Sequence, residues 1–93
     1  MLKLTTELVE FIPDDLEQGK IYVSLPFKCA IHLCACGCGL QTVTPFSPPN
    51  GWTLTLDENN LVTLHPSIGN FQYPCKSHYW IEKGEVNMLP PGT

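Results

Sequence analysis

Hydrophobic and polar residues alternate along much of the chain with a period of two, the pattern of half-buried β-strands. In the clearest case Trp52, Leu54 and Leu56 fall on one face and two threonines fall on the other. A polar Asp-Glu-Asn-Asn turn follows, after which Val62 and Leu64 continue the alternation. This stretch therefore predicts a β-hairpin.

Weaker versions of the same pattern predict the remaining strands. They cover residues 2–12, as one strand or two short ones, and residues 20–25, 41–44, 79–81 and 86–89. The Glu-Lys-Gly-Glu sequence at 82–85 joins the last two as a second hairpin. Residues 27–33 fit either a strand or a short helix, because periodicity cannot decide so short a run.

Proline, glycine and polar residues divide these elements. The acidic pair after Pro13 predicts a single helical turn that Asp14 or Asp15 caps, that runs through Gln18 and that Gly19 ends. Loops are expected at 45–51 and at 66–70, which makes Ser67 a turn residue. Residues 71–73 read as short and extended, and the tail at 90–93 as frayed.

The length of 93 residues and the lack of internal repeats indicate one domain over residues 1–93. The sequence predicts many strands and little helix, so we expect a mostly β fold, with a small α+β domain as the alternative. A core this small gains from a disulfide or metal staple. The combined expectation is a zinc-ribbon-like domain of antiparallel hairpins that one metal ion holds together.

Charge and targeting signals narrow the cellular setting. The net charge is −4, and the five lysines and arginines are not clustered, which argues against nucleic-acid or anionic-membrane binding. Residues 1–12 include Glu7 and Glu10 and lack the apolar core of a secretion signal, and no run is long enough to span a membrane. We therefore expect a reducing cytoplasm, where metal binding is favoured over the alternative of a disulfide-stapled secreted domain.

Two clusters of soft ligands predict a metal site. Cys34, Cys36 and Cys38 alternate with small residues at 32–39, and Cys75 and His78 form a second group at 75–78. Zinc prefers four tetrahedral ligands from Cys and His. If the two clusters meet around one ion, the metal closes a loop of about forty residues. The predicted cofactor is Zn²⁺, with its four ligands drawn from these five side chains.

Several alternatives stay open around this site. If both Cys75 and His78 bind the metal, only two of the three clustered cysteines are needed as ligands. Cys34 could then take the place of Cys36 or Cys38. His32 is either a ligand or a hydrogen-bonded neighbour of the site, and Cys29 reads as a small core residue. An Fe–S cluster and a group of buried free cysteines are the competing explanations.

No reaction is indicated by the sequence motifs. The chain has neither H-x-E nor H-E-x-x-H, and its carboxylates lie in expected turns or on polar faces, away from both clusters. A Cys–His pair can be drawn from Cys75 or Cys38 with His78, but no third orienting residue accompanies it. We assign no catalytic residue and favour a protein-interaction module with a protein partner. The alternative is a zinc- or cysteine-dependent hydrolase or transferase.

Three motifs together resemble those of a family of small zinc-binding bacterial and phage proteins. They are H-x-C-x-C-G-C-G at 32–39, P-S-I-G-N at 66–70 and C-x-S-H-Y-W-I at 75–81, with a Trp-containing hairpin between the first two. The resemblance covers about residues 21–86. Some members are similar to proteins encoded beside bacterial ubiquitin-like conjugation genes, with E1-like and E2-like enzymes. The resemblance thus implies an accessory role in ubiquitin-like protein modification.

Overall fold

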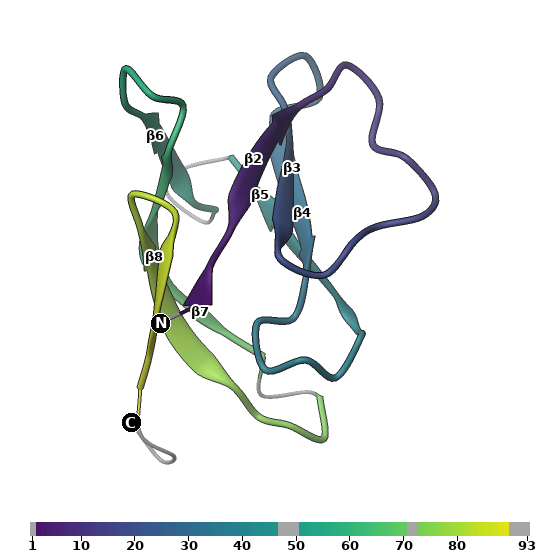
Figure 1. Ribbon diagram of the computed structural model, residues 1–93, viewed down its shortest axis with the longest axis vertical. Coiled ribbons are helices and arrows are strands. Elements are labelled where there is room, and N and C mark those ends of the chain that lie inside the picture. The colour runs from purple at the N-terminus through teal and green to yellow at the C-terminus, as the bar shows by residue number, and fades with distance from the viewer. Residues whose placement is uncertain (1, 47–50, 71–72, 90–93) are drawn as a thin grey trace.

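The computed structural model describes residues 2–46, 51–70 and 73–89, with the backbone alone for Leu2 and Pro66. Within these ranges the chain forms nine β-strands and no helix. The strands make two sheets that pack against each other (Figure 1). The expected mostly β fold is confirmed.

The first sheet has five strands in the order β1-β9-β8-β7-β6, and every neighbouring pair is antiparallel. Both predicted hairpins, β6–β7 and β8–β9, belong to it. The strands are β1 (Leu2–Lys3), β6 (Thr53–Leu56), β7 (Val62–Gly69), β8 (His78–Glu82) and β9 (Glu85–Met88).

The second sheet has four strands in the order β2-β3-β4-β5. They are β2 (Thr5–Leu8), β3 (Lys20–Ser24), β4 (Cys29–Leu33) and β5 (Gln41–Pro45). The ambiguous run at 27–33 is thus largely a strand. The expectation of antiparallel hairpins fails at one place, because β2 pairs with β3 in parallel. The expected helical turn after Pro13 is wrong, since none of residues 14–18 is helical.

The N-terminal segment crosses from one sheet to the other at Leu4. The backbone N–H of Leu4 donates to the carbonyl oxygen of Gly84 at 2.7 Å, and that of Thr5 donates to Gly19 at 2.8 Å. Gly84 has a φ of 77°, and a Cβ there would lie 3.1 Å from the Leu4 oxygen. Glycine is therefore required where the two segments approach so closely.

The hydrophobic core lies between the sheets and draws on both of them. Ile21, Val23 and Ala30 come from the four-stranded sheet, and the five-stranded sheet supplies a larger set: Val62, Leu64, Ile68, Tyr79, Ile81 and Val86. Trp52 is half-buried and packs against this cluster. Trp80 is also half-buried, and the centre of its ring lies 5.5 Å from the centre of the His65 ring.

Strand β7 contains a bulge that the sequence did not predict. Leu64 pairs with Ile81 and Ile68 pairs with Tyr79, so four steps along β7 oppose two steps along β8. The loop expected at 66–70 is wrong, because the strand continues through the bulge to Gly69. Proline is tolerated there because a bulge interrupts the ladder of hydrogen bonds. Leu64 and Ile68 both still face the core, since the two extra residues preserve the alternation.

Some expectations fall on residues outside the described ranges. They concern part of the proline-rich loop, at 47–50, the extended segment at 71–72 and the frayed tail at 90–93. The described residues contain no helix that is long and apolar enough to cross a membrane.

The core makes a first prediction. Ile81 is fully buried in the middle of the five-stranded sheet, so Ile81→Ala should lower the free energy of unfolding by about 2–5 kcal/mol. Met88, exposed on the neighbouring strand, is the matched control, and Met88→Ala should change it by no more than about 0.5 kcal/mol. Urea unfolding followed by tryptophan fluorescence measures both, and equal effects would contradict this assignment of the core.

Candidate functional site

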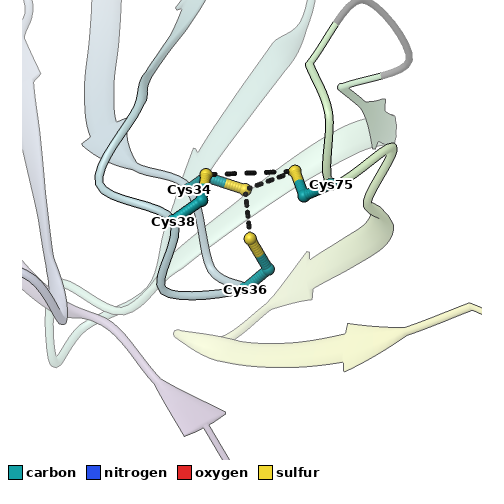
Figure 2. Close-up of side chains that lie close together, drawn as sticks. All are labelled: Cys34, Cys36, Cys38 and Cys75. Carbon is teal, nitrogen blue, oxygen red and sulfur yellow. Dashed lines mark hydrogen bonds between the residues drawn. The ribbon is translucent and has the colours of Figure 1, made fainter.

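Four cysteine side chains converge where the two sheets meet at one end. Cys34, Cys36 and Cys38 lie in the turn between β4 and β5, and Cys75 lies just before β8. Figure 2 shows the four sulfur atoms pointing toward one another. Cys34 Sγ lies 3.4 Å from that of Cys36 and 3.7 Å from that of Cys75, which is 3.9 Å from that of Cys38.

This arrangement fits a tetrahedral metal ion. All four sulfurs lie within 4.8 Å of one another. A metal with bonds of about 2.3 Å to four thiolates sets its sulfur atoms about 3.8 Å apart. The three sulfur–sulfur distances given above span that value, so these cysteines could hold a metal ion.

The turn that carries three of the cysteines is held by its own backbone. The N–H of Cys34 donates to the carbonyl oxygen of Leu40 at 2.7 Å, and the N–H of Gly37 donates to that of Cys34 at 3.0 Å. Gly37 and Gly39 have φ values of 92° and 82°, which side-chain-bearing residues rarely adopt. The glycines therefore let alternate cysteines turn toward one centre.

The electrostatics of the four thiols favour a cation at their centre. The pKa of Cys36 is raised to about 12, first by desolvation and then by its cysteine neighbours. Hydrogen bonds from Ser77 lower the pKa of Cys75 to about 6. Four sulfurs this close resist joint ionisation, and a bound metal ion removes that resistance because it stabilises thiolates.

A buried polar network surrounds Cys34. Ser77 Oγ lies 3.0 Å from Cys34 Sγ, and the side-chain amide of Asn70 donates to Ser77 Oγ at 3.2 Å and to Cys34 Sγ at 3.5 Å. The same amide donates to the Tyr79 hydroxyl at 3.3 Å, and the Thr42 hydroxyl donates to Asn70 Oδ1 at 3.2 Å. Since Thr42 lies on β5 and Tyr79 on β8, the network joins the two sheets beside the cysteines.

His32 belongs to this network rather than to the group of sulfurs. Its Nε2 lies 2.7 Å from the Tyr79 hydroxyl oxygen, and its ring is fully buried. Burial lowers the pKa of His32 to about 4, so the imidazole is neutral at pH 7. Of the two roles that the sequence left open, this geometry matches the hydrogen-bonded neighbour.

His78 faces away from the cysteines. Its Nε2 lies 2.7 Å from Ser67 Oγ, and both residues are half-buried. Tyr79 and Ile68, their neighbours in sequence, point into the core, so Ser67 and His78 lie on the outer face of the five-stranded sheet. The structure thus brings together the four cysteines among the five expected metal ligands. The fifth, His78, contacts Ser67 instead.

The Ser67–His78 pair was missed from the sequence because Pro-Ser and Gly-Asn near Ser67 suggested a turn. One signal could have revealed it. If the strand is extended to Gly69, Ile68 faces the core and its neighbour Ser67 faces outward. Ser67 then lies on the same outer face of the sheet as His78. Cys29, read as a core residue, is half-buried on β4 and lies outside the group of four sulfurs.

Comparison with known proteins gives one finding. A family model described as "Bacterial ubiquitination-like system serine protease (BubE)" matches residues 8–89. This range includes the four cysteines, Ser67 and His78. No curated protein and no solved structure matches the chain.

The sulfur geometry predicts one bound metal ion per chain. Cys34→Ser should abolish stoichiometric binding, because Cys34 is the central and fully buried sulfur. Cys29→Ser is the matched control and should retain the metal, as should His78→Ala. Elemental analysis of each purified variant measures the metal, and cobalt substitution gives a visible absorption band typical of tetrahedral thiolate ligation.

Two results would contradict this site. One is a full metal content in Cys34→Ser. The other is loss of the metal in His78→Ala with a normal content in Cys75→Ser, which would replace the fourth sulfur with an imidazole.

Proposed function

The chain belongs to the BubE family of the bacterial ubiquitination-like system, and from this membership we propose that it is a serine peptidase of such a system. In this proposal Ser67 is the nucleophile and His78 is the general base. The observation that carries it is the 2.7 Å separation between Ser67 Oγ and His78 Nε2. The substrate class that follows is the ubiquitin-like protein of the system, or its conjugates.

The surroundings of the other serines support Ser67 as the nucleophile. The described part of the chain contains Ser24, Ser67 and Ser77. Ser24 is fully buried and donates to the carbonyl oxygen of Glu10, and Ser77 is buried against the cysteines. Among these three, Ser67 is the serine that pairs with a histidine and is accessible to solvent. A nucleophile requires both properties.

The geometry suits acyl transfer. The Ser67 hydroxyl donates to His78 Nε2 when that nitrogen carries no proton, and it transfers the proton there as Oγ attacks the substrate carbonyl. The protonated imidazole then gives the proton to the departing amine, which leaves an ester on Ser67. A water molecule, deprotonated by His78, attacks that ester and releases the acid product and the free serine.

Two features of β7 make the pair accessible. The bulge between Leu64 and Ile68 departs from the regular ladder at Ser67, and bulges often direct a functional side chain in this way. Gly69 pairs directly with His78 across the strands and presents no side chain toward the imidazole. Residue 69 of β7 therefore adds no side chain opposite His78.

We further propose that the four cysteines bind Zn²⁺, which suits a closed site of four thiolates with a structural role. Cys75 lies three residues before His78, and Ser77 between them contacts Cys34. The N–H of Asn70 donates to the Ser77 carbonyl oxygen at 2.8 Å, which closes the ladder next to the Gly69–His78 pair. Fixing Cys75 thus fixes the start of β8, and with it the position of His78.

The proposal departs from the preference for a non-enzymatic module that the sequence alone favoured. What supports the change is the Ser67–His78 distance together with the family's description as a serine protease. Protein partners and a location in the bacterial cytoplasm, where thiolates stay reduced, are parts of the same proposal.

Substitution of the pair tests the reaction. Ser67→Ala should lower the rate of peptide-bond cleavage at least about 10³-fold, because the nucleophile is removed, and His78→Gln should have a similar effect. The substrate is the ubiquitin-like protein of the same system, extended at its C-terminus by a reporter peptide. Thr55→Ala removes an exposed hydroxyl from β6 of the same sheet and should leave the rate unchanged.

Wild-type activity in Ser67→Ala would exclude this serine as the nucleophile. If cleavage of that substrate is absent from the wild-type protein while it binds the same protein, the non-enzymatic accessory role is favoured instead.

Removal of the metal tests the link between the two parts of the site. A chelator that strips the cysteines should lower the cleavage rate at least about tenfold, because displacement of His78 by even 1 Å weakens catalysis. Added Zn²⁺ should restore the rate. A metal-free protein that keeps both its rate and its thermal stability would contradict a role of the cysteines in positioning His78.

A further inference from the structure

A second surface of the molecule exposes large hydrophobic side chains. Phe11 and Phe27 are 67% and 58% exposed, and Leu8 and Leu25 are 49% and 54% exposed. The two phenyl rings lie 5.5 Å apart. These four residues, which we name the loop patch, come from the end of β2 and from the loops that follow β2 and β3.

Partly buried hydrogen bonds hold the two loops of the patch in place. Ser24 is fully buried, and its hydroxyl donates to the carbonyl oxygen of Glu10 at 2.7 Å. The same hydroxyl accepts the backbone N–H of Phe27 at 3.4 Å, so one side chain ties both loops together. The backbone N–H of Val9 also donates to the carbonyl oxygen of Val23 at 2.9 Å. The aromatic side chains are therefore carried on a fixed support, which lowers the entropy lost when a partner binds.

A shallow hollow extends the loop patch. It has a volume of about 330 Å³ and is lined by Leu8, Leu25 and Pro26 together with parts of Val9 and Val23. Exposed rings beside an apolar depression are the usual features of a protein-binding surface, where an anchor side chain fills the depression.

Acidic residues outnumber basic residues around the loop patch. Residues 7–17 hold five of the nine carboxylates of the chain and no lysine or arginine. Lys20 Nζ lies 3.4 Å from Glu7 and 3.2 Å from Glu17, which neutralises part of this charge. The exposed Lys28 follows Phe27 directly and adds one positive charge. Three exposed carboxylates remain, Glu10 next to Phe11 and Asp14 and Asp15 further along the same loop, so negative charge exceeds positive charge in these loops. Complementarity then requires a partner whose apolar surface is flanked by lysine or arginine.

The loop patch is remote from the site described above. Figure 1 shows the start of the loop after β2 and the short loop after β3 at the upper end of the molecule, whereas the turn between β4 and β5 that carries the cysteines lies toward the lower end. A protein bound to the loop patch would therefore leave the cysteine end of the molecule uncovered.

From exposure, support and charge together, we propose that the loop patch docks a protein partner that presents apolar side chains within a basic rim. The partner belongs to the same ubiquitination-like system as the family. This inference does not depend on the peptidase proposal, because the patch belongs to the four-stranded sheet and its loops, whereas Ser67 and His78 lie on β7 and β8 of the five-stranded sheet.

Titration calorimetry with purified components tests the docking. The ubiquitin-like protein and the conjugating proteins of the system are titrated separately into the wild-type chain and into Ser67→Ala, which separates docking from turnover. At least one component should bind, and both Phe11→Ser and Phe27→Ser should weaken its Kd at least tenfold. Met88→Ser, which changes an exposed apolar residue on the other sheet, should leave the Kd unchanged.

The charge requirement is tested in the same experiment. The double variant Asp14→Asn and Asp15→Asn should weaken the Kd several-fold at low salt and by less at high salt, because exposed charges are screened. Binding that survives both phenylalanine substitutions would overturn the proposal, as would no binding by any component. Self-association of the chain that Phe11→Ser abolishes would also overturn it, because the patch would then bind a second copy.

Discussion

The convergence of four thiols between two sheets is the constraint on which the rest of the structure depends. Three of them follow β4 of the four-stranded sheet, and Cys75 precedes β8 of the five-stranded sheet. A chain of 93 residues has a small core, and a link between segments about forty residues apart restricts the unfolded chain strongly. The buried network of Thr42, Asn70 and Tyr79 crosses the same boundary, so it would reinforce a metal link between the two sheets.

The alternation of side chains at the start of β8 divides residues 77–79 between two tasks. Ser77 and Tyr79 point inward, to the cysteines and to His32, whereas His78 between them points outward to Ser67. Residues 77–79 thus contact Cys34 and His32 on the inner side and form the Ser67–His78 pair on the outer side. This shared segment is the physical reason to expect that the metal centre and the proposed reaction depend on each other.

Much of the fold follows from local pattern, and the exceptions have identifiable causes. Both hairpins of the five-stranded sheet were predicted, because their alternation and turn residues are encoded in adjacent positions. The parallel pairing of β2 with β3 was not, since it depends on a connection without a recognisable pattern.

Residue type and spacing predicted that the two clusters meet, with four ligands drawn from five candidates, and the structure brings the four cysteines together without His78. The spacing of Cys75 and His78 suits two ligands in one turn, but β8 begins at His78 and directs it to the opposite face. Ser67 was assigned to a turn because local proline and glycine cannot be distinguished from a bulge without the partner strand.

Covalent labelling of the folded protein with a fluorophosphonate tests the central claim most directly, because such probes react with serines that a neighbouring base activates. The account predicts one phosphonyl adduct per chain, located by peptide mass mapping at Ser67, and none after the protein is unfolded. An adduct at another serine would contradict it. So would the absence of any adduct under conditions that fully label a known serine peptidase.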